Sequence, residues 1–339
     1  MNGEITRREL WSQPKRWQYL INRFPETDLP DLALNSFDEI IVFGSGTSYY
    51  LAMLLAMLLE QKGMYAKAVP SCELFLHEDL YLGSKATKRL GIGISRSGES
   101  SEGLIAADLL KSRDIPLLAL GCDADSSLPQ TSNYQLIVSE GHEEGMVMLR
   151  SFTSMLLGFQ LFLGHSTTPF NTIPEKGEKL LDQHASALKI LANKRSFNRF
   201  VMLGSGFHYP LAVEASLKFQ EMAISTSEAY HSLEYRHGPK STADTNTLAV
   251  LFALDGNEQY GVKLVEDLND YGVSCLVVGE KVEAYRKAAS YTIELSSMLS
   301  VSNRLVLSLL PVQVLAFETA LRLGQNPDSP RNLSAVVKL

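Results

Sequence analysis

The sequence has few cysteines and no segment typical of a secreted or membrane protein. Its 339 residues include three cysteines, Cys72, Cys122 and Cys275, and no Cys-x-x-Cys pair. A disulfide framework and a cysteine zinc site are therefore not expected. The first ten residues, MNGEITRREL, contain no apolar signal core, and apolar stretches such as 51–59 and 305–310 are shorter than a membrane span. These absences predict a soluble, cytoplasmic protein with no membrane partner.

The sequence also lacks an excess of basic residues. It has 31 lysines and arginines against 38 aspartates and glutamates, a net charge of −7 at pH 7. A protein whose main partner is nucleic acid needs a basic surface, so we expect no nucleic-acid partner. An anionic small molecule is still compatible with this charge, because the local hydrogen-bond donors of a site decide whether it binds.

Short apolar stretches alternate with helical ones, which is typical of an α/β protein with a parallel sheet covered by helices on both faces. In the first half we expect strands at about 39–43, 66–70, 90–95, 116–121 and 135–138. We expect helices at about 49–61, 101–112 and 152–163. A polar helix at about 175–193 then leads to another strand at 200–203.

Two parts of the chain repeat each other at a constant shift of 160 residues. FGSGTSYYLA (43–52) matches LGSGFHYPLA (203–212) in a strand–loop–helix pattern. We interpret this as two copies of one α/β domain. The expected organisation is an N-terminal helical arm (1–30) anchored by Trp11 and Trp17, a first domain (31–168), a helical linker (169–193) and a second domain (194–339).

Two loops of the first copy have the composition of a phosphate site. GSGTS (44–48) and SRSGESS (95–101) each follow an expected strand and precede a helix, where backbone N–H groups and the helix dipole favour an anion. In a parallel sheet such loops lie at the carboxyl edge, where ligands bind. For either loop alone, an ordinary helix cap with turn glycines is the better explanation, and the two loops together favour an anion site. Neither is a GxGxxG or Walker motif, so no dinucleotide or nucleoside triphosphate is favoured.

The motifs GSGTSYY, SRSGES and LEYRHGPKS together resemble the signature of the sugar isomerase (SIS) phosphosugar-binding family. The chain is similar to the isomerase half of glucosamine-fructose-6-phosphate aminotransferase and to stand-alone deaminases and ketose/aldose isomerases with two SIS domains. The similarity extends from the TRRELWSQP segment (6–14) to the terminal PRNL (330–333). It implies that both domains are three-layer α/β/α SIS domains.

The resemblance assigns a sugar phosphate to the first domain. The residues that it implies as substrate contacts are Thr47, Ser48, Ser95, Arg96, Ser97 and Ser100. Arg96 stands where the aminotransferase has a neutral amide and would add a charge-assisted hydrogen bond to the phosphate. Serine hydroxyls that orient the phosphate through hydrogen bonds, together with an arginine that offsets its charge, would account for the composition of this loop.

A carboxylate and an imidazole would suffice to isomerise or deaminate a sugar phosphate, and we expect neither metal nor cofactor. Lys218 and Glu221, in LKFQE, lie on one helix face. The resemblance makes Glu221 the base that moves the proton, with Lys218 beside it; the alternative is a surface ion pair, for which Glu214 is also available. It makes His237, in EYRHGP, the ring-opening residue, acting in the neighbouring subunit's site of a homodimer; the alternative is a structural histidine.

Two positions depart from the aminotransferase pattern. Ala335 stands where the aminotransferase has a Schiff-base lysine, and Met148 stands where it has a serine that holds the sugar. No sequence like the glutaminase domain precedes the motifs, so glutamine-dependent synthesis is not expected.

These features predict an enzyme, a metal-independent deaminase/isomerase of an amino-sugar 6-phosphate that gives a ketose 6-phosphate and ammonia. The alternatives are a ketose/aldose 6-phosphate isomerase of the tagatose type, a deglycase of an amino-acid-conjugated sugar 6-phosphate, and a regulator that only binds a phosphosugar.

Overall fold

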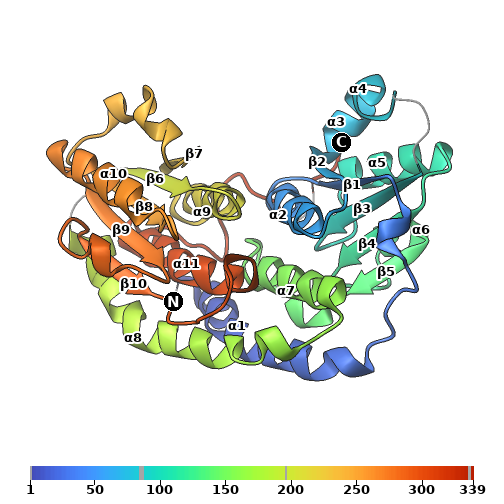
Figure 1. Ribbon diagram of the computed structural model, residues 1–339, viewed down its shortest axis with the longest axis horizontal. Coiled ribbons are helices and arrows are strands. Elements are labelled where there is room, and N and C mark those ends of the chain that lie inside the picture. The colour runs from blue at the N-terminus through green and yellow to red at the C-terminus, as the bar shows by residue number, and fades with distance from the viewer. Residues whose placement is uncertain (1, 84–87, 195–196, 335–336) are drawn as a thin grey trace. The chain divides into compact units, whose positions relative to one another are not determined.

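The computed structural model describes residues 2–83, 88–194, 197–334 and 337–339. Its chain divides into two compact units, each with its own sheet (Figure 1). The first-sheet unit consists of Lys15–Glu144, Met148–Asn171 and Ser334–Leu339. The second-sheet unit consists of Met1–Pro14, Gly145–Val147 and Thr172–Leu333.

The sheet of the first-sheet unit is parallel, and the described residues contribute five strands in the order β2-β1-β3-β4-β5. These strands are β1 (Glu39–Gly44), β2 (Ala66–Pro70), β3 (Arg89–Ser95), β4 (Leu117–Gly121) and β5 (Tyr134–Ile137). The helices of this unit are α2 (Thr47–Gln61), α3 (Ser71–Leu76), α4 (Glu78–Leu82), α5 (Ser101–Ser112), α6 (Ser127–Thr131) and α7 (Arg150–Gly164). Every residue of β1, β3 and β4 is buried, because helices cover both faces of a parallel sheet.

The sheet of the second-sheet unit repeats this arrangement, since its order β7-β6-β8-β9-β10 matches that of the first sheet. Its described strands are β6 (Arg199–Gly204), β7 (Thr226–His231), β8 (Thr247–Phe252), β9 (Ser274–Gly279) and β10 (Tyr291–Glu294). The helices are α8 (Ile173–Lys194), α9 (His208–Ala223), α10 (Glu258–Asp270) and α11 (Leu305–Arg322). The predicted α/β fold with two tandem copies is therefore confirmed.

Helix α1 (Glu4–Arg23) carries the two tryptophans that were expected to anchor the N-terminal arm. Trp11 packs edge-on against Phe317, with 5.8 Å between the ring centroids, and both residues belong to the second-sheet unit. Trp17 is buried and donates from Nε1 to Thr153 Oγ1 at 3.1 Å, both within the first-sheet unit. The contacts of α1 thus divide between the units at Pro14.

Short 3₁₀ helices connect several of these elements. Those described are Phe24–Glu26, Leu34–Ser36, Ser139–Gly141, Thr168–Phe170, Glu234–Arg236, Pro239–Thr242, Glu283–Tyr285 and Val301–Asn303. Helix α8 covers most of the expected linker and packs on α11 within the second-sheet unit. Helix α11 is long and apolar enough to span a membrane, but 89% of its apolar window is buried inside the protein, as in a core helix.

The strand-to-helix turns of the two copies also match at their glycines. A Cβ on Gly44 would lie 2.6 Å from the backbone carbon of Ser48, and one on Gly204 would lie 2.0 Å from the carbonyl oxygen of His208. Only glycine therefore allows each helix to begin this close to its strand. Two residues later, Gly46 and Gly206 have nearly equal positive φ angles of 55° and 56°. The shared geometry explains why the GSG sequence occurs in both copies.

Candidate active site

The loop from β1 to α2 places Thr47 and Ser48 at the first turn of a helix. Both residues are buried, and Gly46, with its positive φ, caps the helix without a side-chain hydrogen bond. The helix begins with Tyr49 N donating to the Gly46 carbonyl at 2.9 Å. The first amides of such a helix point outward with the positive end of the helix dipole, which is a suitable environment for an anion.

The loop from β3 to α5 is held in shape by its own side chains. Ser95 Oγ accepts a hydrogen bond from Gly98 N at 2.9 Å, and Ser97 Oγ accepts one from Glu99 N at 3.2 Å. The Glu99 carboxylate ties the loop to α6 by accepting from Ser127 N at 2.7 Å and Ser127 Oγ at 2.9 Å. Gly98 has a φ of 67°, which favours glycine in this tight turn. These hydrogen bonds fix the shape of the loop.

The two loops follow neighbouring strands, because β1 and β3 pair in parallel with Phe43 beside Gly93. Their six predicted substrate residues thus come to one edge of the first sheet. Ser100 caps α5 without a side-chain hydrogen bond to the helix. The end of the chain lies beside it, since Ser101 N donates to the Val337 carbonyl at 3.3 Å and Leu339 N donates to Ser101 Oγ at 3.2 Å.

Arg96 faces a buried carboxylate that the sequence motifs do not reveal. The Arg96 side chain is 12% exposed, and its Nη1 lies 3.9 Å from Glu143 Oε2. Glu143 also accepts from the backbone amides of Leu149 at 2.8 Å and Arg150 at 2.6 Å at the start of α7. Burial raises the pKa of the neighbouring Cys122 thiol, and the Glu143 charge raises it further. The thiol is therefore neutral and is not a nucleophile.

The second-sheet unit holds a lysine buried between two carboxylates on α9. Lys218 has no exposed side-chain surface, and its Nζ lies 2.5 Å from Glu221 Oε2 and 3.2 Å from Glu214 Oε1. Burial alone would lower the pKa of Lys218, but the two carboxylates outweigh it and raise that pKa. Glu214 is fully buried, whereas the Glu221 side chain is 16% exposed. Of the two carboxylates, that of Glu221 is therefore the accessible one.

His237 lies in the turn after β7, with its ring exposed and its backbone N–H donating to the Glu234 carbonyl at 2.9 Å. Gly238, with a φ of 118°, reverses the chain directly after it. His208, by contrast, is buried against Phe252, and burial followed by the Arg304 charge lowers its pKa to about 3. His208 is therefore a neutral, structural histidine.

The predicted site residues thus form two groups. The six predicted phosphate contacts belong to the first-sheet unit, and Lys218, Glu221 and His237 belong to the second-sheet unit. Met148 is partly buried before α7, and Ala335 lies outside the described residues. No cluster of metal-ligand side chains occurs in the described part of the chain.

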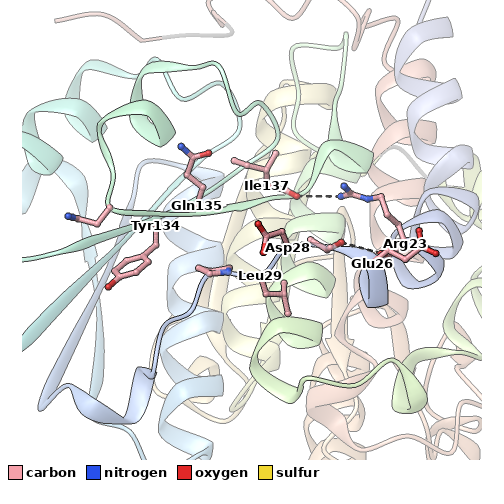
Figure 2. Close-up of a pocket in the computed structure, with 10 residues that line it drawn as sticks. Arg23, Glu26, Asp28, Leu29, Tyr134, Gln135 and Ile137 are labelled. Atoms are coloured by element: carbon pink, nitrogen blue, oxygen red, sulfur yellow. Dashed lines mark hydrogen bonds between the residues drawn. The ribbon is translucent and has the colours of Figure 1, made fainter.

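A separate cleft of about 600 Å³ lies in the first-sheet unit beside the edge strand β5 (Figure 2). Arg23 spans one end of it, with Nη2 donating to the Ile137 carbonyl at 3.5 Å and Nε 2.7 Å from Glu140. The residues that line the cleft are Arg23, Glu26, Thr27, Asp28, Leu29, Pro30, Asn133, Tyr134, Gln135 and Ile137. None of the predicted site residues contributes to it.

The two units repeat one α/β arrangement, and the first of them carries serine-rich loops at the edge of its sheet. Comparison with protein families gives the same result: residues 33–164 and 194–321 each match the SIS domain. The chain therefore belongs to the SIS domain family, with two copies of the domain.

Curated relatives include two glutamine–fructose-6-phosphate aminotransferases. The one from Pyrobaculum aerophilum is 27% identical over 318 residues, covering 90% of this chain and 52% of the relative. The one from Chlamydia abortus is 25% identical over 354 residues, covering 97% of this chain and 58% of the relative. The chain thus spans about half the length of the curated relatives that it matches.

Solved structures match the whole chain. Glucosamine-6-phosphate deaminase from Thermotoga maritima is 26% identical with a TM-score of 0.81, covering 99% of this chain and 100% of that one. Tagatose-6-phosphate ketose/aldose isomerase from Escherichia coli is 24% identical with a TM-score of 0.85, covering 97% of this chain and 95% of that one, and shows the shared fold. These relatives are enzymes, which confirms the predicted enzyme class.

The buried cluster on α9 makes a testable prediction about stability. Lys218→Met leaves Glu214 and Glu221 without their buried counter-charge and should lower the free energy of unfolding by about 3–5 kcal/mol. Lys179→Met is the matched control, because Lys179 is also four residues after a glutamate but is 56% exposed; exposed pairs contribute little. Urea unfolding monitored by circular dichroism measures both. Adding Glu214→Gln to Lys218→Met should recover part of the loss, and equal effects of the two lysine substitutions would contradict the buried cluster.

Proposed function

We propose that the chain is a metal-independent deaminase/isomerase that converts an amino-sugar 6-phosphate, such as glucosamine 6-phosphate, to a ketose 6-phosphate and ammonia. The observation that carries this proposal is the Lys218 ammonium, buried between Glu214 and Glu221, with Glu221 alone of the two carboxylates partly exposed. A carboxylate fixed in this way suits proton transfer at carbon. The similarity to a glucosamine-6-phosphate deaminase over the full chain supports the choice of substrate.

In the proposed reaction, Glu221 removes the proton from C2 of the open-chain amino sugar, and the electrons move to the C1 carbonyl to give an enolamine. Returning the proton to C1 leaves a C2 imine. Water then adds to the imine, and ammonia leaves, so that a ketose 6-phosphate remains. Lys218 keeps the Glu221 carboxylate oriented through the 2.5 Å contact.

The substrate phosphate is assigned to the serine-rich edge of the first sheet. Thr47, Ser48, Ser95, Ser97 and Ser100 would supply hydroxyl and amide donors there. Arg96 would add the charge-assisted hydrogen bond, with its guanidinium oriented by the buried Glu143. Support comes from the order of this loop, whose shape is already fixed by the internal bonds of Ser95, Ser97 and Glu99.

His237 is assigned to ring opening, and the exposed ring at a sharp turn is compatible with that task. The proposal includes a cytoplasmic homodimer in which His237 acts in the site of the neighbouring subunit. It needs no metal and no cofactor.

A ketose/aldose 6-phosphate isomerase is the second candidate, because the same base would move a proton between C1 and C2 without loss of nitrogen. Met148 stands where the aminotransferase has a serine that holds the sugar, and this difference favours a substrate with another arrangement of hydroxyls. Such a substrate could be a sugar 6-phosphate conjugated to an amino acid, in which case the enzyme would be a deglycase.

The deaminase proposal is tested by measuring ammonia released from glucosamine 6-phosphate. We expect release by the wild-type protein, and a fall in turnover of at least ~100-fold in Glu221→Gln, which keeps the shape of the side chain but removes the base. Glu228→Gln is the matched control, since Glu228 is a partly exposed glutamate of the same unit that pairs with Arg199. Formation of ketose without ammonia, from a non-amino sugar phosphate, would favour the isomerase. Undiminished turnover in Glu221→Gln would refute the role of Glu221.

The phosphate assignment is tested separately by binding. Arg96→Ala should weaken binding of a sugar 6-phosphate by about 1.5–3 kcal/mol, the scale of a hydrogen bond to a charged group, and leave the unphosphorylated sugar unaffected. Arg113→Ala, at the exposed far end of α5, should change neither. Isothermal titration with both ligands gives the comparison. An equal loss for the phosphorylated and unphosphorylated sugar in Arg96→Ala would contradict the assignment.

A further inference from the structure

The second sheet carries a loop of different chemistry at the position of the serine-rich loop in the first. Pairing sets the correspondence: Phe43 lies beside Gly93 in the first sheet, and Leu203 lies beside Leu251 in the second. Four residues after these positions, in the loops that follow β3 and β8, Ser97 corresponds to Asp255. The next residues, Gly98 and Gly256, both have a positive φ, of 67° and 79°. By this register, a carboxylate stands in the second copy where a hydroxyl stands in the first.

The Asp255 carboxylate is paired with a buried arginine. Arg304, just before α11, has a side chain that is 4% exposed, and its Nη2 forms an ion pair with Asp255 Oδ2. Its Nη1 donates to the Leu299 carbonyl, and its Nε lies 3.8 Å from the Glu280 carboxylate. A guanidinium offers several donors to an anion, and the carboxyl edge of a parallel sheet is where ligands bind.

A second carboxylate at this edge, that of Glu280, is held mainly by backbone N–H groups. Glu280 accepts from Ser297 N at 3.2 Å, Ser297 Oγ at 2.8 Å and Met298 N at 2.7 Å. Ser296 and Met298 have φ angles of 47° and 57°, a left-handed conformation that costs free energy in residues other than glycine. Successive amides in such a turn form a concave site for an anion, and here Glu280 occupies it.

The Asp255 carboxylate uses only part of the hydrogen-bonding capacity of Arg304. Asp255 Oδ1 and Arg304 Nε are buried, and neither has a hydrogen-bond partner among the described residues. A tetrahedral anion presents more oxygens than one carboxylate and could accept from both edges of the guanidinium. The arrangement therefore has the donors of an anion site but contains a protein side chain in the place of the anion.

We propose that the carboxyl edge of the second sheet is an anion site closed by the protein's own carboxylate, with Asp255 occupying the place of a phosphate on Arg304. The inference rests on the correspondence of the two sheets and on the contacts of Arg304, and does not depend on the proposed reaction. It follows that the second copy binds no phosphosugar while Asp255 is present, and that removing this side chain opens a site for phosphate.

The test compares the thermal midpoint of wild-type protein and Asp255→Ser with and without inorganic phosphate. Serine is the residue at the corresponding position of the first copy. We expect phosphate to raise the midpoint of Asp255→Ser by about 2 °C or more beyond its effect on wild type, because a ligand that binds the folded state stabilises it. The double variant Asp255→Ser/Arg304→Gln should lose this extra rise. Asp255→Asn, which fills the same space without charge, should show a smaller rise than Asp255→Ser.

The same phosphate-induced rise in wild type and Asp255→Ser would overturn the proposal. If Asp255→Ser does not fold in phosphate-free buffer, refolding in phosphate should restore its circular dichroism spectrum, and failure of phosphate to do so would also overturn it. The measured quantity is the difference in phosphate-induced rise between Asp255→Ser and wild type. If the first copy had no phosphate site, the proposed function would be disproved, but this difference could still be measured.

Discussion

One buried lysine constrains what the α9 helix can do. Lys218 is surrounded by protein, and its charge is tolerated only because Glu214 and Glu221 lie on the same helix face at 3.2 and 2.5 Å. Such a cluster is expensive to bury and contributes little net stability compared with apolar side chains of similar size. This cost is one reason for the chemical role that we propose for the cluster. Glu214 neutralises part of the lysine charge from the interior, and Glu221 presents a fixed carboxylate at the surface.

The two copies of the fold differ in the residues at the carboxyl edges of their sheets. Both sheets have the same strand order, and both first turns require glycine where a helix begins against its strand. In the first copy, hydroxyls and Arg96 line the carboxyl edge, and the negative partner of the arginine, Glu143, is 3.9 Å away. In the second copy, Arg304 is in direct contact with Asp255. The arginine of the first edge therefore lies among hydroxyls, whereas the arginine of the second lies beside the carboxylates of Asp255 and Glu280.

The parts of the fold that sequence could predict are those with local signals. Strand β2 and helix α5 have the predicted bounds, because an apolar run between turn residues and a serine-capped helix are recognisable within a few residues. Strand β7 (Thr226–His231) gives no such signal, since it is an edge strand with most of its side chains partly or fully exposed. The alternation of strands and helices in the sequence was enough to place the serine-rich loops at the carboxyl edge of a parallel sheet. The sequence could not reveal Glu143 opposite Arg96, or Asp255 opposite Arg304, because 47 and 49 residues separate these partners and only the folded chain brings them together.

The most direct test of the central claim is the fate of deuterium at C2 of a sugar 6-phosphate. Glucosamine 6-phosphate and glucose 6-phosphate labelled at C2 are incubated with the protein, and the label is followed by nuclear magnetic resonance. If the chain moves a proton between C2 and C1, deuterium leaves C2 of at least one of them and appears at C1 of the ketose or in the solvent. Full retention of the C2 label in both compounds, under conditions where a sugar phosphate raises the thermal midpoint of the protein, would contradict the account and leave a protein that binds phosphosugars without acting on them.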